Sequence, residues 1–271
     1  KLPIQRMKVL PKDFKNAFVP LMLPVLLIVG LILPENLSTA AILFVCSIAL
    51  LFVGRINLKY LAMFMLIGIF ALTLYIVIVM NVAEDTGRTH TWINRIERFI
   101  SPSEEELEEG IVITDENYQT MHAKIAVASG GIFGKAPGRS TQRNLLPHPY
   151  SDFIFAIIVE EYGLAGGVFV IMMYLILLYR AIAIMVAIPQ SFGGFLSFGL
   201  AFLLVMQAMI NMGVAVGLLP VTGQPLPLVS KGGTSMLFTG ISIGIILSVS
   251  KEVNKIKEKR DELKPATESD S

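Results

Sequence analysis

One carboxylate near the middle of the chain, Asp152, stands where a long polar stretch meets a long apolar one. The polar stretch covers about residues 84–151. The residues after Asp152 are uncharged up to residue 250, apart from Glu160, Glu161, Arg180 and Lys231. A carboxylate at such a boundary could act as a general base on a membrane-anchored substrate. It could equally cap the helix that follows, because Ser and Asp at a helix start accept hydrogen bonds from free N–H groups. The residues alone leave both roles open.

Glu160 and Glu161 are a second pair of carboxylates, about two helical turns after Asp152. Ionisable side chains inside a membrane span are costly, and they usually face the interior of a helix bundle or a polar cavity. One interpretation is a structural pair that bonds to a neighbouring helix. The other is a part in the site, or in moving a polar head group across the membrane.

Basic side chains form a third group. They lie in the polar stretch and in the loop before the last apolar stretch: Arg88, Arg95, Arg98, Lys124, Lys135, Arg139, Arg143 and Lys231. Such cations, with or without a divalent metal such as Mg²⁺ or Mn²⁺, could stabilise the charge on a leaving diphosphate. They could also bind lipid head groups or pair with the acidic run around residues 104–109. Prolines before Lys231 and a glycine pair after it predict a shaped loop.

Other chemical motifs fail on spacing. In residues 130–136, only three residues separate the glycines of a would-be P-loop, and alanine rather than Ser or Thr follows the lysine. His148, Ser151 and Asp152 are the residue types of a hydrolase triad, but they lie on one segment and lack a Gly-x-Ser-x-Gly elbow. The histidines are scattered and show no metal-ligand spacing. We expect no nucleic-acid partner.

The elements that must position these residues are membrane-spanning helices. Only 16% of the residues are charged, whereas a soluble domain carries roughly a quarter. A helix needs about 20 apolar residues to cross the hydrocarbon core. Six spans are expected, in residues 17–33, 36–54, 60–83, 153–179, 181–230 and 232–250, with prolines at 189 and 220 trimming the fifth. The sequence therefore predicts an all-α, polytopic helical membrane protein.

Basic residues indicate the orientation. They crowd the first 16 residues, the turn at Arg55 and Lys59, and the tail at 251–260. Six spans place all three on one side, which the positive-inside tendency makes cytoplasmic. We therefore expect four parts: a basic cytoplasmic segment with three spans in 1–83, a large extracytoplasmic loop containing short helices in 84–151, three spans in 152–250, and a disordered cytoplasmic tail in 251–271.

Several ordered motifs stand at compatible spacing along nearly the whole chain. The most specific are Ser151-Asp152-Phe153-Ile154-Phe155-Ala156, Glu160-Glu161-Tyr162-Gly163, Gly217-Leu218-Leu219-Pro220 and Ser230-Lys231-Gly232-Gly233-Thr234-Ser235; shorter ones include Arg95-Ile96 and Tyr118-Gln119. Together they resemble the SEDS (shape, elongation, division and sporulation) family of FtsW, RodA and SpoVE, and the residues around Asp152 are most similar to the FtsW division branch. Members of that family have ten spans, so we expect this chain to match the last six.

The resemblance implies a peptidoglycan glycosyltransferase that polymerises lipid II at the outer face of the bacterial cytoplasmic membrane during cell division. Asp152 matches the family's catalytic aspartate. The implied partners are lipid II, membrane lipids, a class B penicillin-binding transpeptidase and other divisome membrane proteins. Candidate substrate-binding residues are Arg95, Gln119, Lys124, Arg139, Arg143, Glu160, Glu161 and Lys231. Two alternatives remain: a lipid II flippase that depends on the paired glutamates, and a non-catalytic divisome scaffold.

Overall fold

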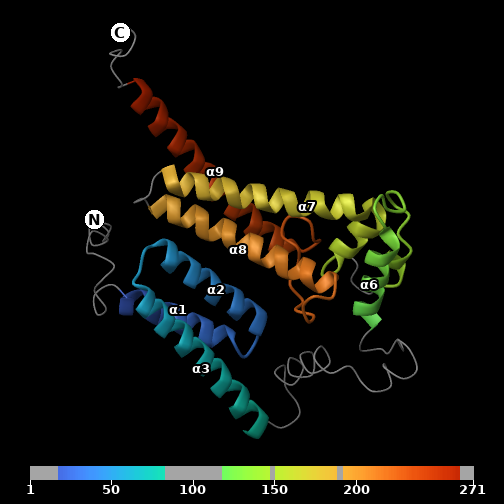
Figure 1. The fold of residues 1–271 in the computed structure, drawn as a ribbon, viewed down its shortest axis with the longest axis horizontal. Helices are drawn as coiled ribbons and strands as arrows, with labels where there is room; N and C mark the ends of the chain where they lie inside the picture. Colours follow the sequence, from blue (N-terminus) through green and yellow to red (C-terminus); the bar gives the residue numbers. More distant parts are fainter. Residues whose placement is uncertain (1–17, 83–117, 147–149, 188–191, 263–271) are drawn as a thin grey trace. The chain divides into compact units, whose positions relative to one another are not determined.

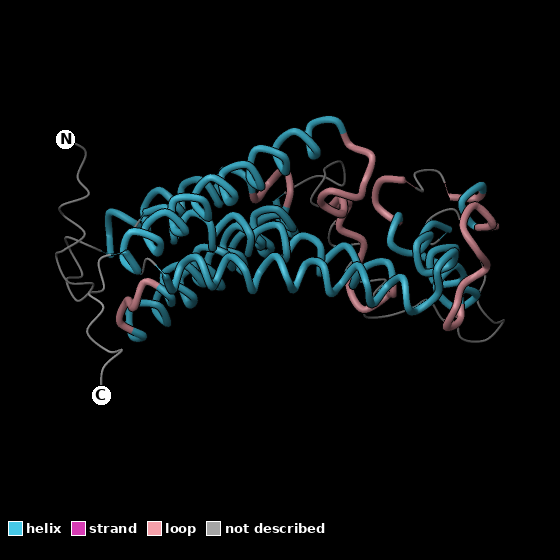
Figure 2. The backbone as a smooth tube through the Cα atoms, turned by 90° about the horizontal axis from the view of Figure 1, so that it is seen from above, coloured by secondary structure: helices cyan, strands magenta, loops and turns pink. Residues whose placement is uncertain are grey.

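The structure is a computed structural model that describes residues 18–82, 118–146, 150–187 and 192–262. Every element in these ranges is a helix or a loop (Figure 2), so the predicted all-α class is confirmed. The chain divides into two compact units. The first contains the first three helices and residues 217–224, and the second contains residues 122–216 and the chain from Pro225 onward.

The first unit is built from α1 (Val19–Ile32), α2 (Leu37–Val53) and α3 (Leu58–Val82). The turn between α1 and α2 is closed by Asn36, whose side chain accepts a hydrogen bond from the Thr39 N–H at 3.0 Å and so caps α2. Aromatic side chains fill the core, and the ring of Phe64 lies 4.8 Å from that of Phe44 and 6.4 Å from that of Phe18.

The second unit contains α6 (Tyr118–Gly130) from His122 onward, a short 3₁₀ helix (Gln142–Asn144), α7 (Ile154–Ala187), α8 (Phe192–Ala215) and α9 (Gly233–Glu262). Helices α7 and α8 lie side by side, and α9 packs against α8 (Figure 1). Ala181 of α7 and Ala201 of α8 are both 0% exposed in this core. Small side chains at such positions let helix backbones approach closely, as membrane helices commonly do.

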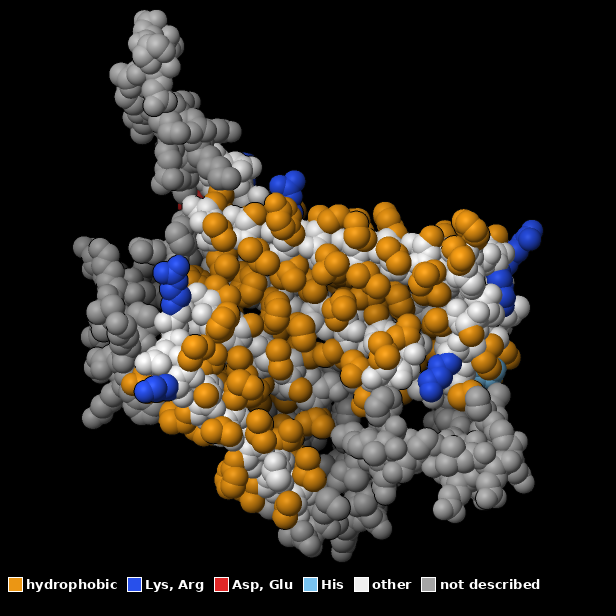
Figure 3. Space-filling model, viewed as in Figure 1, with side chains coloured by type: hydrophobic (Ala, Val, Ile, Leu, Met, Phe, Trp, Pro, Cys, Tyr) orange, Lys and Arg blue, Asp and Glu red, His pale blue; other side chains and the backbone are white. Residues whose placement is uncertain are grey.

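The apolar helices occupy the six stretches that the sequence predicts for spans. Four are long and apolar enough to cross a membrane, in Leu58–Val77, Ile154–Ala187, Phe192–Ala215 and Gly233–Lys255, and two shorter apolar helices, α1 and α2, have 14 and 17 residues. Hydrophobic side chains cover the visible face of α7 and α8, and basic side chains appear only near its ends (Figure 3). The chain is therefore a polytopic helical membrane protein.

The end of the chain differs from the prediction. We expected disorder from residue 251, but α9 continues to Glu262, so that prediction is wrong for residues 251–262. No glycine or proline interrupts the sequence between Gly244 and Pro265, and Lys, Glu and Arg are good helix formers. A helix that has already formed is extended at little cost, because the unfavourable nucleation step is complete. Residues 263–271 lie outside the described part of the chain.

Candidate active site

Helix α7 is interrupted at Gly163. Its backbone angles are φ 70° and ψ −169°, in a region that is essentially restricted to glycine. A Cβ atom at this position would also lie only 2.2 Å from the carbonyl oxygen of Ile132. The interruption divides α7 into a short helical segment, residues 154–162, and a long one, residues 164–187.

The short segment of α7 folds back alongside the long one. The Ser230 hydroxyl donates a hydrogen bond to the Ser151 carbonyl, and the Tyr174 hydroxyl donates one to the Pro227 carbonyl. Residues 226–230 form a single turn. Even with both side chains extended, these contacts bridge at most on the order of 25 Å. A continuous helix from residue 151 to residue 174 would be about 35 Å long, so α7 cannot be continuous over this stretch. Its direction reverses at the interruption, because a Cβ atom at Gly167 would lie 3.1 Å from a Val159 methyl group and 3.4 Å from the Phe155 ring.

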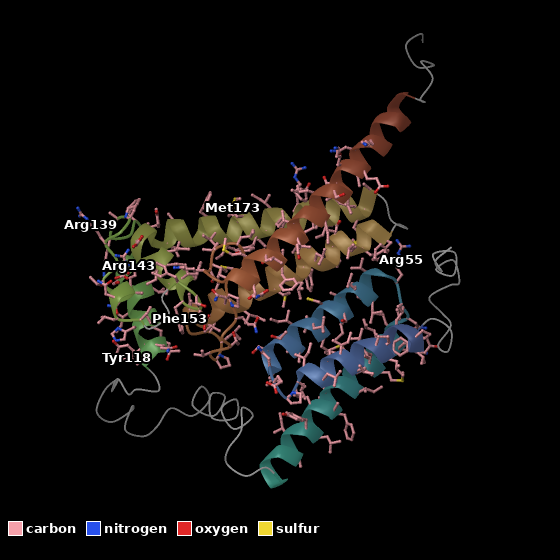
Figure 4. The ribbon with its side chains drawn as sticks, turned by 180° about the vertical axis from the view of Figure 1, so that it is seen from behind. Arg55, Tyr118, Arg139, Arg143, Phe153 and Met173 are labelled. Carbon is pink, nitrogen blue, oxygen red and sulfur yellow. The ribbon has the colours of Figure 1, made fainter. Side chains whose placement is uncertain are left out.

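The reversal changes where the predicted carboxylates lie. Figure 4 shows Phe153, the neighbour of Asp152, between Met173 of α7 and the loop that carries Arg139 and Arg143. Glu160 lies at the interruption, against that loop, instead of deeper in one continuous span. The expectation of a single helix running from Phe153 into the membrane is therefore wrong. Its physical reason is the positive φ angle at one glycine, which hydropathy does not register.

Three hydrogen bonds hold the main chain around Asp152. Asn211 Nδ2 donates to the Asp152 carbonyl at 2.8 Å, and Ser230 Oγ donates to the Ser151 carbonyl at 2.5 Å. The Lys231 N–H donates to the Tyr150 carbonyl at 2.8 Å. The Ser230 hydroxyl also accepts a hydrogen bond from the Leu226 N–H at 2.7 Å. Helix α8 and the loop of residues 225–231 thus position the peptide that carries the candidate base.

The Asp152 carboxylate itself is half-buried. Its Oδ1 atom accepts a hydrogen bond from the Ser151 hydroxyl at 2.7 Å. Within the described residues, no backbone N–H of α7 bonds to this carboxylate. The Ala156 N–H bonds instead to the Phe153 carbonyl at 3.0 Å. Asp152 therefore does not cap α7 in this structure. Its second carboxylate oxygen has no hydrogen-bond partner among the described residues.

Glu160 is the most heavily bonded side chain in this region, and it is 0% exposed. Its carboxylate accepts hydrogen bonds from six groups: Lys135 Nζ (2.7 Å), Thr141 Oγ1 (2.8 Å), the Thr141 N–H (3.2 Å), the Gln142 N–H (3.3 Å), Ser129 Oγ (3.4 Å) and Ser140 Oγ. Lys135 supplies the compensating charge. A buried charge needs such pairing, because desolvation would otherwise cost several kcal/mol.

Main-chain bonds reinforce the same contact. The N–H groups of Lys135 and Ala136 donate to the carbonyls of Glu160 and Glu161 at 2.9 and 3.0 Å, and the Leu164 N–H donates to the Gly131 carbonyl at 2.9 Å. These α7 groups are available because the interruption removes their usual partners within the helix. The loop of residues 131–143, the anchored loop hereafter, is therefore fixed to α7 at the interruption.

The predicted site residues fall into separate places. Lys231 is exposed and adjoins the Asp152 peptide through its backbone, whereas Arg139 (exposed) and Arg143 (half-buried) lie on the anchored loop (Figure 4). Gln119 and Lys124 lie on α6, where Gln119 is half-buried and Lys124 is exposed. Glu161 is half-buried on α7. Arg95 lies outside the described residues.

Sequence reasoning missed four residues that hold this region together: Lys135, Tyr174, Asn211 and Ser230. Lys135 was considered only as one of the basic side chains, and Ser230 belongs to a motif that carries the family resemblance. Their partners are 25 to 79 residues away in the chain, so no spacing signal could pair them. Tyr174 lies in an apolar run and gave no signal at all.

The helices and the site define a polytopic membrane protein in which an interrupted helix and two loops present one half-buried carboxylate. The chain belongs to the cell cycle protein family of FtsW, RodA and SpoVE, whose sequence profile matches residues 3–255. This confirms the SEDS resemblance.

Relatives with 32–33% sequence identity include stage V sporulation protein E of Bacillus subtilis and a probable peptidoglycan glycosyltransferase FtsW of Geobacter metallireducens. The first is 32% identical over 241 residues (88% of this chain, 61% of that protein), and the second is 33% identical over 243 residues (88% and 60%). The chain thus spans about three fifths of the length of these relatives.

Two solved structures share the fold. One, described as showing structural coordination of polymerization and crosslinking by a peptidoglycan synthase complex, matches with a TM-score of 0.65 and 27% identity, over 92% of this chain and 66% of that one. The other is a crystal structure of a mutant of the Thermus thermophilus rod shape determining protein RodA, with a TM-score of 0.53 and 26% identity, over 87% and 57%.

Proposed function

We propose that this chain is the catalytic part of a peptidoglycan glycosyltransferase that polymerises lipid II, with Asp152 as its general base. The observation that supports this proposal is the half-buried Asp152 carboxylate, whose peptide is held by Asn211 and by the loop of residues 225–231. Relatives of the chain are named probable peptidoglycan glycosyltransferases. A base positioned by main-chain bonds keeps its carboxylate available to a substrate hydroxyl.

The proposed reaction is an inverting glycosyl transfer between two lipid II molecules. Asp152 takes the proton of the acceptor 4-hydroxyl while that oxygen forms a bond to the anomeric carbon of the donor. The bond between this carbon and the diphosphate breaks, and its electron pair leaves with undecaprenyl diphosphate. Inversion requires one basic carboxylate, unlike the two-carboxylate scheme of retaining glycosidases. The Ser151 hydroxyl holds one oxygen of the base in place.

The charge of the leaving diphosphate requires cations. Lys231 is one candidate, since its N–H bonds to the carbonyl of Tyr150, two residues before Asp152, and Arg139 and Arg143 are the others. Among the described residues, no three His, Cys, Asp or Glu side chains come together to hold a metal ion. Mg²⁺ is usually held by one or two carboxylates together with substrate phosphates, and no step of the proposed reaction depends on such a cation.

The setting of the reaction is part of the proposal. We place it at the outer face of the bacterial cytoplasmic membrane, during cell division and beside a class B penicillin-binding transpeptidase. The similarity of the Asp152 motif to the FtsW branch supports the division role. The relative described as a complex for polymerization and crosslinking supports the partner. Arg95, Gln119, Lys124 and Glu161 remain predicted substrate contacts.

The transporter alternative gains no support from the described residues. A head-group carrier would need a carboxylate that faces a polar path, whereas Glu160 is fully buried and bonded to the anchored loop.

The test is polymerisation of purified lipid II by the full-length protein with its transpeptidase partner. Asp152→Asn keeps the size and the Ser151 contact of the side chain but removes the base, so the rate should fall at least about 100-fold, as expected for general base catalysis. Thermal stability should be unchanged. The control is Glu252→Gln, the same kind of change at an exposed position of α9. A variant that retains more than about a tenth of the rate would refute the assignment of the base.

A further inference from the structure

We propose that Glu160 is a positioning residue: it binds no substrate itself but fixes the anchored loop, and with it Arg139 and Arg143, relative to Asp152. This inference rests on the proposed function, because it gives Arg139 and Arg143 their role toward the diphosphate. It reassigns Glu160 from the substrate contacts that the sequence suggests.

The arrangement of donors requires an ionised carboxylate at this position. Six groups donate to the two Glu160 oxygens, and three of them come from Thr141 and Gln142 alone. A glutamine amide would place an NH₂ group against some of these donors, because only one of its two polar atoms accepts hydrogen bonds. No surface of the side chain is left for a ligand, since it is 0% exposed.

Residues that bond to Glu160 lie on both sides of Arg139 and directly before Arg143 along the chain. Before Arg139, the main chain is fixed at residues 135 and 136 by the carbonyls of Glu160 and Glu161. After it, Thr141 and Gln142 bond to the Glu160 carboxylate. The Arg143 N–H donates to the Ser140 hydroxyl at 3.0 Å, and that hydroxyl donates to Glu160. Both guanidinium groups therefore extend from a backbone that Glu160 holds.

The same glutamate connects the loop to the candidate base. Glu160 and Asp152 are joined by the short helical segment of residues 154–162, which spans about 12 Å. The loop is also bonded to α6, because the Gln142 side chain lies 2.6 Å from the His122 ring nitrogen Nδ1. Losing the carboxylate would free the part of the loop around Thr141 and Gln142, while the main-chain bonds at residues 135 and 136 remain. The Asp152 peptide would stay bonded to Asn211 and Ser230.

Hydrogen–deuterium exchange of the full-length protein tests the structural half of the proposal. Glu160→Gln should raise the exchange rate of the Thr141 and Gln142 amides at least tenfold, because both donate to the carboxylate. Glu252→Gln is the matched control and should leave them unchanged. Equal exchange in Glu160→Gln and the wild type would overturn the proposal.

Binding and kinetics test the functional half. In the Asp152→Asn background, which removes the chemistry, Glu160→Gln should weaken lipid II binding about tenfold. In the active enzyme it should raise KM by a similar factor and lower kcat less than threefold. In an Arg139→Gln/Arg143→Gln background, the same substitution should add little, because the groups that it positions are gone.

The outcomes separate the alternatives. A fall in kcat at constant KM means loss of folded enzyme and overturns the positioning role. A raised KM without faster exchange makes Glu160 a direct ligand and overturns it as well. If Asp152→Asn stays active, the proposed base fails, yet the exchange rates and the KM of Glu160→Gln still decide the role of Glu160.

Discussion

Gly130 provides a direct test of how closely α6 packs against the interrupted helix. It is the last residue of α6 and has ordinary helical geometry, so alanine would normally be favoured there by about 1 kcal/mol. A Cβ atom at Gly130 would, however, lie 2.1 Å from the Val159 carbonyl oxygen, whereas real Cβ contacts essentially never fall under 3.0 Å. The obstacle is backbone, which has no rotamer to change.

The cost follows from that distance. The end of α6 and residues 159–160 must separate by about 1 Å, and overpacking of this kind costs about 1–3 kcal/mol. The shift also strains the bonds that run from Gly134 to the Gly130 carbonyl and from Lys135 to the Glu160 carbonyl, each worth about 1 kcal/mol. We expect Gly130→Ala to destabilise the protein by about 2–4 kcal/mol.

Thermal unfolding of the purified protein measures this effect. At about 2–4 °C per kcal/mol, the Tm should fall by roughly 4–16 °C. Gly244→Ala is the matched control, because it makes the same change inside α9, where nothing lies within 4 Å of the added Cβ atom. That variant should gain about 0.5–1 kcal/mol. If the two variants shift the Tm equally, or Gly130→Ala raises it, the close approach of α6 to α7 is refuted.

Two further predictions concern the loop of residues 225–231. Tyr174→Phe removes the hydroxyl that bonds to the buried Pro227 carbonyl and should lower the free energy of unfolding by about 1–3 kcal/mol. The Tm measures this effect, with Tyr179→Phe at an exposed position of the same helix as the control. An unchanged Tm would contradict the contact. Lys231→Met should leave the Tm unchanged, because the side chain is exposed, but lower kcat about tenfold, and Lys231→Arg should retain activity. Full activity of Lys231→Met would remove this lysine from the mechanism.

The spans could be predicted from the sequence because a single physical constraint sets them. A fixed hydrocarbon thickness demands long uncharged helices, and such stretches are visible in composition alone. Short helices were also expected within residues 84–151, and α6 (Tyr118–Gly130) is one such helix.

The interruption of α7 could not be predicted in this way. Gly163 stands among apolar residues that read as one continuous span, and a positive φ angle leaves no trace in hydropathy. The partners of Glu160 lie 18 to 31 residues earlier in the chain, so their convergence depends on that interruption. The sequence suggested a pair of intramembrane glutamates, whereas in the structure the Glu160 carboxylate bonds to the anchored loop.

The hydrogen bonds around Asp152 also account for why a residue so well suited to capping is left uncapped. Helix α7 begins only at Ile154, after the Phe153 carbonyl has accepted the first helical bond, so the free N–H groups start beyond the carboxylate. Asn211, Ser230 and Lys231 all bond to carbonyls of residues 150–152, and none of these three bonds involves the carboxylate. The peptide is fixed while the acid keeps an oxygen that no described residue occupies. A general base needs this combination of a rigid support and an open acceptor.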